Sequence, residues 1–126
     1  PYAISLGLVG SEMCIRDSSQ AIRIGEFLYT SGQISLDPNS MELITGNIEV
    51  ETERVLKNIE AILNADGLKL NNIIKTTVYL TDLSEFGRMN QVYEKFFVET
   101  KPARACVQVA ALPKGAKVEI DAIAHQ

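Results

Sequence analysis

The sequence predicts an α+β domain in which one mixed β-sheet carries two helices on one face. Short stretches rich in β-branched and aromatic residues alternate with two longer stretches that have helical periodicity. A length of 126 residues suits one domain, and 46% hydrophobic with 22% charged residues suits a globular core. The expected order is strand, strand, helix, strand, helix, strand, strand (ββαβαββ).

The first two strands are expected at 20–25, which reads QAIRIG, and at 26–35, which reads EFLYTSGQIS. Only Gly25 and Glu26 separate the two apolar runs, so a tight hairpin should join them. A turn-rich loop follows at 36–46.

Residues 48–66 are expected to form the first helix. Val55, Ile59 and Leu63 recur at four-residue spacing and define its apolar stripe. Gly67 follows as a typical residue for ending a helix.

The next strand is expected at 72–80, and a second helix follows it. Asp82 is expected to cap this helix, with Glu85 completing a capping box. The helix should end near Lys101 and Pro102, because the residue before a proline avoids helical conformation. Its apolar side is formed by Phe86, Met89, Val92, Tyr93 and Phe96.

The last two strands are expected at 103–110 and 117–125, joined by LPKGA. Side chains alternate between the two faces of a strand. In the first of these strands the apolar alternation indicates that Ala105, Val107 and Val109 face the helices. In the second strand the same alternation indicates that the residues facing the helices are Val118, Ile120, Ala122 and Ala124.

Arg104 and Cys106 are therefore expected on the sheet face away from the helices. Matching the apolar faces of the two strands pairs Cys106 with Glu119 and Arg104 with Asp121. An exposed pair of this kind could serve only to balance charge, at about 0–1 kcal/mol. If another subunit buries the face, the guanidinium needs an anion, and its fork fits a substrate carboxylate. Nothing in one chain covers this face, so self-association is expected.

The net charge of −4 and a pI of about 5.0 disfavour generic nucleic-acid or anionic-membrane binding. No apolar run approaches the roughly 18 residues that a membrane helix needs. Cys14 and Cys106 have neither disulfide-framework nor metal-ligand spacing, and His125 is the only histidine. We therefore expect no metal, no cofactor and a reducing, cytoplasmic location.

The motifs TSGQI, MNQVYEKFF and KPARACVQVAALPKGAKVEIDAIA resemble the RidA family, also called YjgF/YER057c/UK114. The likeness runs from Ser19 to the end of the chain, so 19–126 is expected to be a RidA-like domain. The resemblance implies a chorismate-mutase-like fold. It also implies a homotrimer whose sheets form an inner barrel, with sites in the clefts between subunits.

The activity that the resemblance implies is hydrolysis of 2-imino and enamine acids to 2-oxo acids and ammonia. Such acids, for example 2-aminoacrylate and 2-iminobutyrate, are released by pyridoxal-phosphate enzymes acting on serine or threonine. By position, Arg104 would grip the substrate carboxylate and Glu119 would position or activate water. Pocket residues would be Cys106, Asn90, Ser31, Gly32 and Tyr2.

Residues 1–18 form an atypical N-terminal segment. The family's GPYSQAI motif is split here, because Pro1 and Tyr2 stand sixteen residues before SQAI. Residues 3–18 are therefore interpreted as an arm or hairpin outside the core, or as a non-native insertion. The transfer of Tyr2 to the pocket depends on which is correct.

Two other functions remain open from the sequence. A non-catalytic trimer could sense small carboxylates through Arg104, and some relatives are reported as ribonucleases or translation inhibitors. The acidic charge and the lack of a basic aromatic stretch count against RNA. Covalent catalysis by Cys106 is disfavoured because no base is evident beside it.

Overall fold

The computed structural model describes residues 2–3 and 20–126, and the predicted order of elements is confirmed. Its two helices are α2 (Ile48–Ala65) and α3 (Phe86–Phe96). Its strands are β1 (Tyr2–Ala3), β2 (Ala21–Ile24), β3 (Phe27–Thr30), β4 (Ile73–Leu80), β5 (Ala103–Gln108) and β6 (Val118–His125). The interpretation of 3–18 as an arm or insertion concerns residues that lie almost entirely outside the described part.

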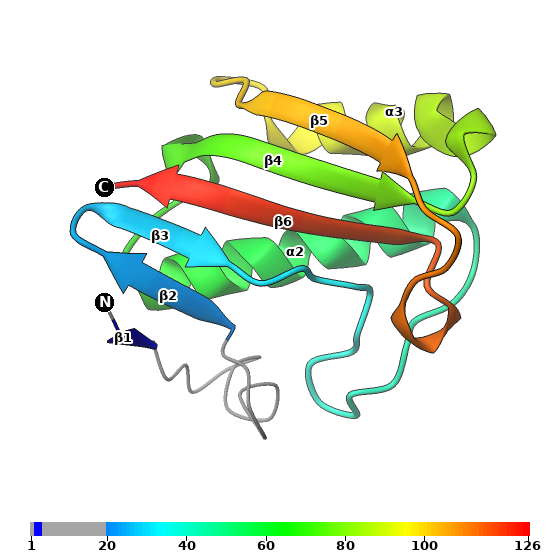
Figure 1. Ribbon diagram of the computed structural model, residues 1–126, viewed down its shortest axis with the longest axis horizontal. Coiled ribbons are helices and arrows are strands. Elements are labelled where there is room, and N and C mark those ends of the chain that lie inside the picture. Colours follow the sequence, from blue (N-terminus) through cyan, green and yellow to red (C-terminus); the bar gives the residue numbers. More distant parts are fainter. Residues whose placement is uncertain (1, 4–19) are drawn as a thin grey trace.

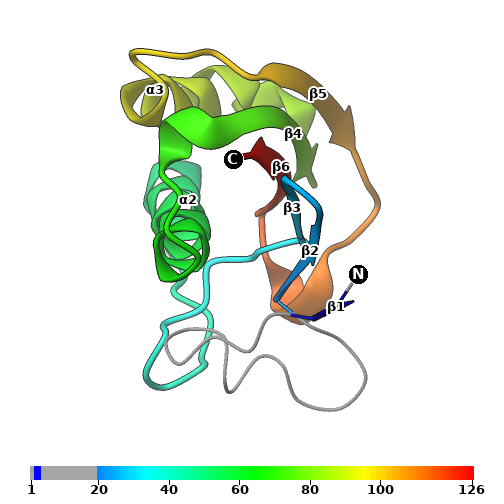
Figure 2. The ribbon, with the colours of Figure 1, turned by 90° about the vertical axis from the view of Figure 1, so that its left-hand side faces the viewer.

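The strands form one mixed sheet in the order β1-β2-β3-β6-β4-β5, and both helices lie on the same face of it (Figures 1 and 2). The predicted two-layer arrangement is therefore confirmed. In the described part of the chain, no helix combines the length and the apolar character that crossing a lipid bilayer requires.

The tight hairpin between β2 and β3 is also confirmed. Ile24 pairs with Phe27, so only Gly25 and Glu26 lie between the strands. Gly25 has a φ of 58°, in the left-handed region that such turns require and that glycine adopts without steric cost.

The first helix forms where the apolar stripe predicts it. Asn47 caps it, because its side chain accepts a hydrogen bond from the backbone N–H of Val50. Val55, Ile59 and Leu63 are fully buried against the sheet. Gly67 follows the end of the helix with a φ of 77°.

The expected boundaries of the second helix are wrong at both ends. Asp82 does act as a cap, but for a 3-10 turn at Leu83–Glu85 that leads into α3. Glu85 makes no capping hydrogen bond with its side chain. The helix ends at Phe96, well before Lys101, and the residues between run back toward β5.

The predicted pairing of the last two strands is wrong, because β4 lies between them. Strand β5 pairs with β4 in parallel, and β6 pairs with the other edge of β4 in antiparallel orientation. The connection between them passes the end of β4, where Val109 donates to the carbonyl of Leu80 and Thr81 donates to that of Lys117. LPKGA is therefore part of a crossover and not of a hairpin.

The expected orientation of Arg104 and Cys106 is wrong as well. Their partners on β4 are Thr76 and Val78, which are both 0% exposed on the helix side of the sheet. Because paired residues share a face, Arg104 and Cys106 point toward the helices. Val107 lies on the opposite face and is 43% exposed.

That opposite face, which we call the open face, carries several exposed apolar residues and is uncovered in a single subunit. Its exposed large apolar residues are Ile22, Ile24, Phe27, Tyr29 and Val107. Exposed large apolar residues gathered on one face, as on β2 and β3 here, are typical of a protein–protein interface.

Candidate functional site

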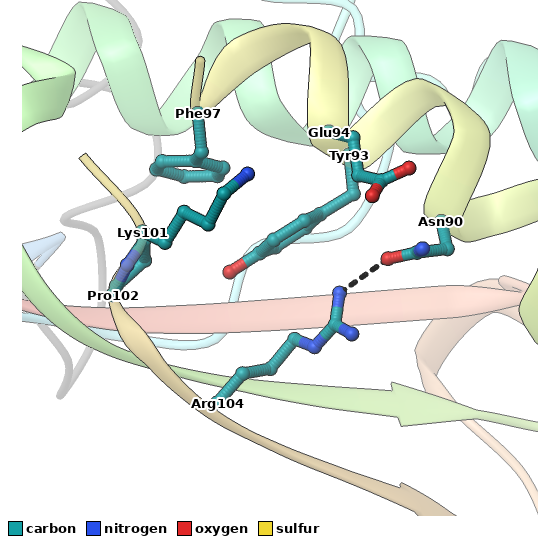
Figure 3. Close-up of a pocket in the computed structure, with 7 residues that line it drawn as sticks. All are labelled: Asn90, Tyr93, Glu94, Phe97, Lys101, Pro102 and Arg104. Carbon is teal, nitrogen blue, oxygen red and sulfur yellow. Dashed lines mark hydrogen bonds between the residues drawn. The ribbon is translucent and has the colours of Figure 1, made fainter. Parts of the chain in front are cut away.

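Arg104 lies against one face of α3. Phe86, Asn90 and Tyr93 have the spacing i, i+4 and i+7, so they share that face. Nη1 of Arg104 donates a hydrogen bond of 2.6 Å to Oδ1 of Asn90 (Figure 3). The guanidinium carbon lies 4.6 Å from the ring centre of Tyr93 and 5.1 Å from that of Phe86. We call Arg104 and these three residues the arginine half-site.

Tyr93 is a rigid part of this half-site. Its hydroxyl is 2.7 Å from Oγ1 of Thr76 in a buried hydrogen bond, and its ring packs 4.6 Å from that of Phe97. Burial raises the pKa of Tyr93, against the opposing effects of the Thr76 hydrogen bond and of Arg104. The phenol therefore stays neutral beneath the guanidinium.

A cavity of about 280 Å³ opens beside Arg104 (Figure 3). It is lined by Asn90, Tyr93, Glu94, Phe97, Lys101, Pro102 and Arg104. Among the residues that the structure describes, no carboxylate forms an ion pair with Arg104. The half-site thus offers an unpaired cation next to a space large enough for a small organic acid.

Cys106 lies two residues along β5, where it packs against the hydrophobic core. Burial raises the pKa of its thiol, and Arg104 opposes this shift. His125 pairs with Phe27 on the open face of the sheet, so it does not lie beside Cys106 of the same subunit. A thiol whose pKa is raised is not an activated nucleophile.

Glu119 is the centre of a second cluster, on the open face. A β-carbon built on Gly32 would lie 2.7 Å from Cδ of Glu119, so only glycine leaves room for the carboxylate there. Gln33 holds this segment to β6 through reciprocal backbone hydrogen bonds with Ile120 of 2.8 and 3.0 Å. We call Glu119 and Gly32 the glutamate half-site. Ser31 precedes Gly32, but its hydroxyl donates to the carbonyl of Gln20 and accepts from Nε2 of Gln33.

The surroundings of Glu119 raise its pKa. Partial burial is the larger cause, and the like charge of Asp121 adds to it. Asp121 in turn accepts a 3.2 Å hydrogen bond from the hydroxyl of Tyr79, the cross-strand neighbour of Glu119. A half-buried carboxylate with a raised pKa is suited to general acid–base chemistry.

The predicted site residues thus fall into two groups on opposite faces of the sheet. Arg104, Asn90 and Cys106 lie on the helix side of the edge strand β5, whereas Glu119 lies on the open face two strands away. The predicted cluster of arginine, thiol and two carboxylates is therefore not formed within one subunit. Tyr2 belongs to β1, at the edge of the sheet opposite to β5.

Sequence reasoning missed the roles of Phe86 and Tyr93, which it assigned only to the apolar side of the helix. The signal was present: the two aromatic residues and Asn90 share one helix face, and Asn90 is a polar residue within an apolar stripe. Nowhere in residues 2–3 and 20–126 do three or more potential His, Cys, Asp or Glu metal ligands gather.

The family model described as endoribonuclease L-PSP matches residues 12–126 of the chain. The mouse protein named 2-iminobutanoate/2-iminopropanoate deaminase is 48% identical over 108 residues, which cover 86% of this chain and 80% of that protein. A RutC family protein of Pyrococcus abyssi is also 48% identical over 108 residues, covering 86% and 85% of the two chains.

Solved structures are similar along most of the chain. Escherichia coli TdcF with bound serine is 43% identical with a TM-score of 0.84, covering 89% of this chain and 90% of that one. RidA from an Antarctic Psychrobacter is 42% identical with a TM-score of 0.89, covering 98% and 99%. The chorismate-mutase-like fold expected from the sequence is confirmed by this similarity.

Proposed function

The chain belongs to the endoribonuclease L-PSP family, which includes its RidA and RutC relatives, and on this basis we propose that it hydrolyses 2-imino acids to 2-oxo acids and ammonia. The observation that carries the proposal is Arg104, an unpaired and oriented cation beside a cavity that suits a small carboxylate. The deaminase names of the mouse, rat and human relatives support the reaction.

The chemistry needs few groups. A protonated imine has an electrophilic carbon that water can attack, and the resulting carbinolamine loses ammonia to leave the 2-oxo acid. Arg104 would hold the carboxylate, and Glu119 would take a proton from the attacking water and return it to the leaving nitrogen. General acid–base help of this kind contributes roughly 10²- to 10⁴-fold.

Arg104 and Glu119 face opposite sides of the sheet, so we place each site between two subunits. The arginine half-site of one subunit would meet the glutamate half-site of its neighbour. The uncovered apolar residues of the open face support self-association, and the family resemblance favours a homotrimer as the form it takes. We also place the protein in the cytoplasm, where a free Cys106 remains reduced.

The test is a coupled assay. A threonine or serine dehydratase releases the imine, and 2-oxo acid formation is followed with and without this protein. We expect the protein to accelerate the step beyond spontaneous hydrolysis, whereas an equal concentration of an unrelated acidic protein should not. Equal rates in both samples would exclude imine hydrolysis as its activity.

The close approach of the Glu119 carboxylate to Gly32 leads to a separate prediction. Gly32→Ala should displace the Glu119 carboxylate and lower imine hydrolysis by about tenfold or more, because small misplacements of a catalytic group are costly. The matched control is Gly87→Ala, since a β-carbon on this α3 residue would meet nothing within 4 Å. Rates are compared after equal thermal unfolding midpoints are established. If Gly32→Ala and Gly87→Ala are equally active, Glu119 does not act from this position.

A further inference from the structure

The guanidinium of Arg104 is held although its residue is exposed in the isolated subunit. A free arginine side chain on an edge strand samples many rotamers, and ordering such a side chain on binding costs conformational entropy. Here one amide and two aromatic rings contact the guanidinium before any ligand is present. That arrangement reduces the entropy that a ligand would otherwise have to remove.

The contacts leave one edge of the guanidinium free. Asn90 accepts from Nη1, and no other residue in the described part of the chain accepts from Nε or Nη2. The Nε and Nη2 edge carries two parallel N–H groups, whose spacing matches the two oxygens of a carboxylate. A planar acid can therefore bind this edge while the rings and Asn90 keep their contacts.

The ring of Tyr93 is anchored to β4, the strand that pairs with the strand of Arg104. Thr76 is the register partner of Arg104 on β4, and its hydroxyl bonds that of Tyr93. Tyr93 is only 5% exposed and also packs against Phe97. The ring beneath the guanidinium therefore belongs to the rigid core, whereas Phe86 provides a second ring that is only partly buried.

We propose that Phe86 and Tyr93 are positioning residues that form an aromatic cradle for Arg104 and so set its affinity for carboxylates. The inference rests on the proposed function for the identity of the ligand, a small 2-oxo or 2-imino acid. Neither ring acts on the reacting carbon. Loss of a ring should therefore raise Kd and KM while kcat, which depends on Glu119, changes little.

The experiment measures the Kd of 2-oxobutanoate by isothermal titration calorimetry. We expect a Kd roughly 3- to 10-fold higher for Tyr93→Leu and for Phe86→Leu, as the loss of a cation–π contact predicts. Tyr93→Phe keeps the ring and should stay within about twofold of the wild type. Leu28→Ala removes buried volume from β3, which lies three strands away from the strand of Arg104. It controls for lost stability and should leave Kd unchanged.

A second readout reports on the guanidinium itself. In NMR spectra the Nε–Hε signal of Arg104 should show a ring-current shift in the wild type, and this shift should shrink in either leucine variant. Phe86 is only partly buried, so Phe86→Leu is expected to fold even if Tyr93→Leu does not. The Phe86 variant alone then decides the test. An unchanged Kd in a folded leucine variant overturns the cradle, as does a wild type that does not bind 2-oxobutanoate.

The outcomes also separate this inference from the proposed function. If the leucine variants weaken 2-oxobutanoate binding but the wild type does not accelerate imine hydrolysis, the deaminase proposal fails and the cradle stands. If hydrolysis is accelerated but Kd is equal in all folded variants, the deaminase proposal stands and the cradle fails.

Discussion

Arg104→Ala is expected to lower kcat/KM for imine hydrolysis by at least about 100-fold. The substitution removes two charge-assisted hydrogen bonds to the substrate carboxylate, each worth about 1.5–3 kcal/mol, and 1.4 kcal/mol corresponds to tenfold. Folding should be preserved, because the side chain is exposed in the subunit and forms no ion pair within the described residues. The coupled dehydratase assay provides the rate, and size-exclusion chromatography the assembly state.

Arg104→Lys is the matched control for charge. It retains a cation in the half-site but loses the planar fork and the ring contacts, so an intermediate rate is expected. A rate for Arg104→Ala equal to that of the wild type, in a protein of the same assembly state, would show that the guanidinium has no part in the reaction.

Glu119→Gln is expected to lower kcat by roughly 10²- to 10⁴-fold, the usual contribution of a general acid–base group. Because the amide preserves shape, binding of 2-oxobutanoate should remain within a few-fold of the wild type. This split between turnover and binding distinguishes an enzyme from a carboxylate sensor. Full turnover in the Gln variant would assign proton transfer to another group.

The pH dependence of the rate gives an independent check on Glu119. As a general base it must be deprotonated, and burial together with Asp121 raises its pKa. The rate should therefore fall on the acid side at a higher pH than an ordinary glutamate would give. Asp121→Asn removes the like charge, so this fall should move to lower pH. Spontaneous hydrolysis is subtracted at each pH, and an unmoved profile would argue against Glu119 as the titrating base.

Local patterns predicted most of the fold. The four-residue spacing of Val55, Ile59 and Leu63 located α2, and the position of Gly25 located the hairpin, because these features depend on neighbouring residues. Helix α3 ends at Phe96, earlier than the end near Lys101 that Pro102 had indicated. That proline marks the start of β5 instead, after a segment whose Lys101 and Pro102 line the cavity.

Strand pairing was less predictable, since it depends on contacts distant in sequence. The short link between β5 and β6 fits a hairpin as well as a crossover. Alternation in β5 was misleading because Val107 lies exposed on the open face of the sheet and does not belong to the core of the subunit. Arg104 and Cys106 were consequently assigned to the wrong face.

The site residues came from the family resemblance more than from pattern. Spacing alone does not reveal that Gly32 accommodates the Glu119 carboxylate or that two rings flank Arg104, because these contacts exist only after folding. The separation of the arginine and glutamate half-sites was likewise invisible before the strand order was known.

The central claim is that Arg104 of one subunit works with Glu119 of another. Co-expression of Arg104→Ala and Glu119→Ala subunits under two affinity tags, followed by tandem purification, yields oligomers that contain both. In the proposed homotrimer each mixed oligomer should then hold one intact site of three, so activity should recover to about one third of the wild type. Activity that stays at the level of the two parent variants would contradict the shared site.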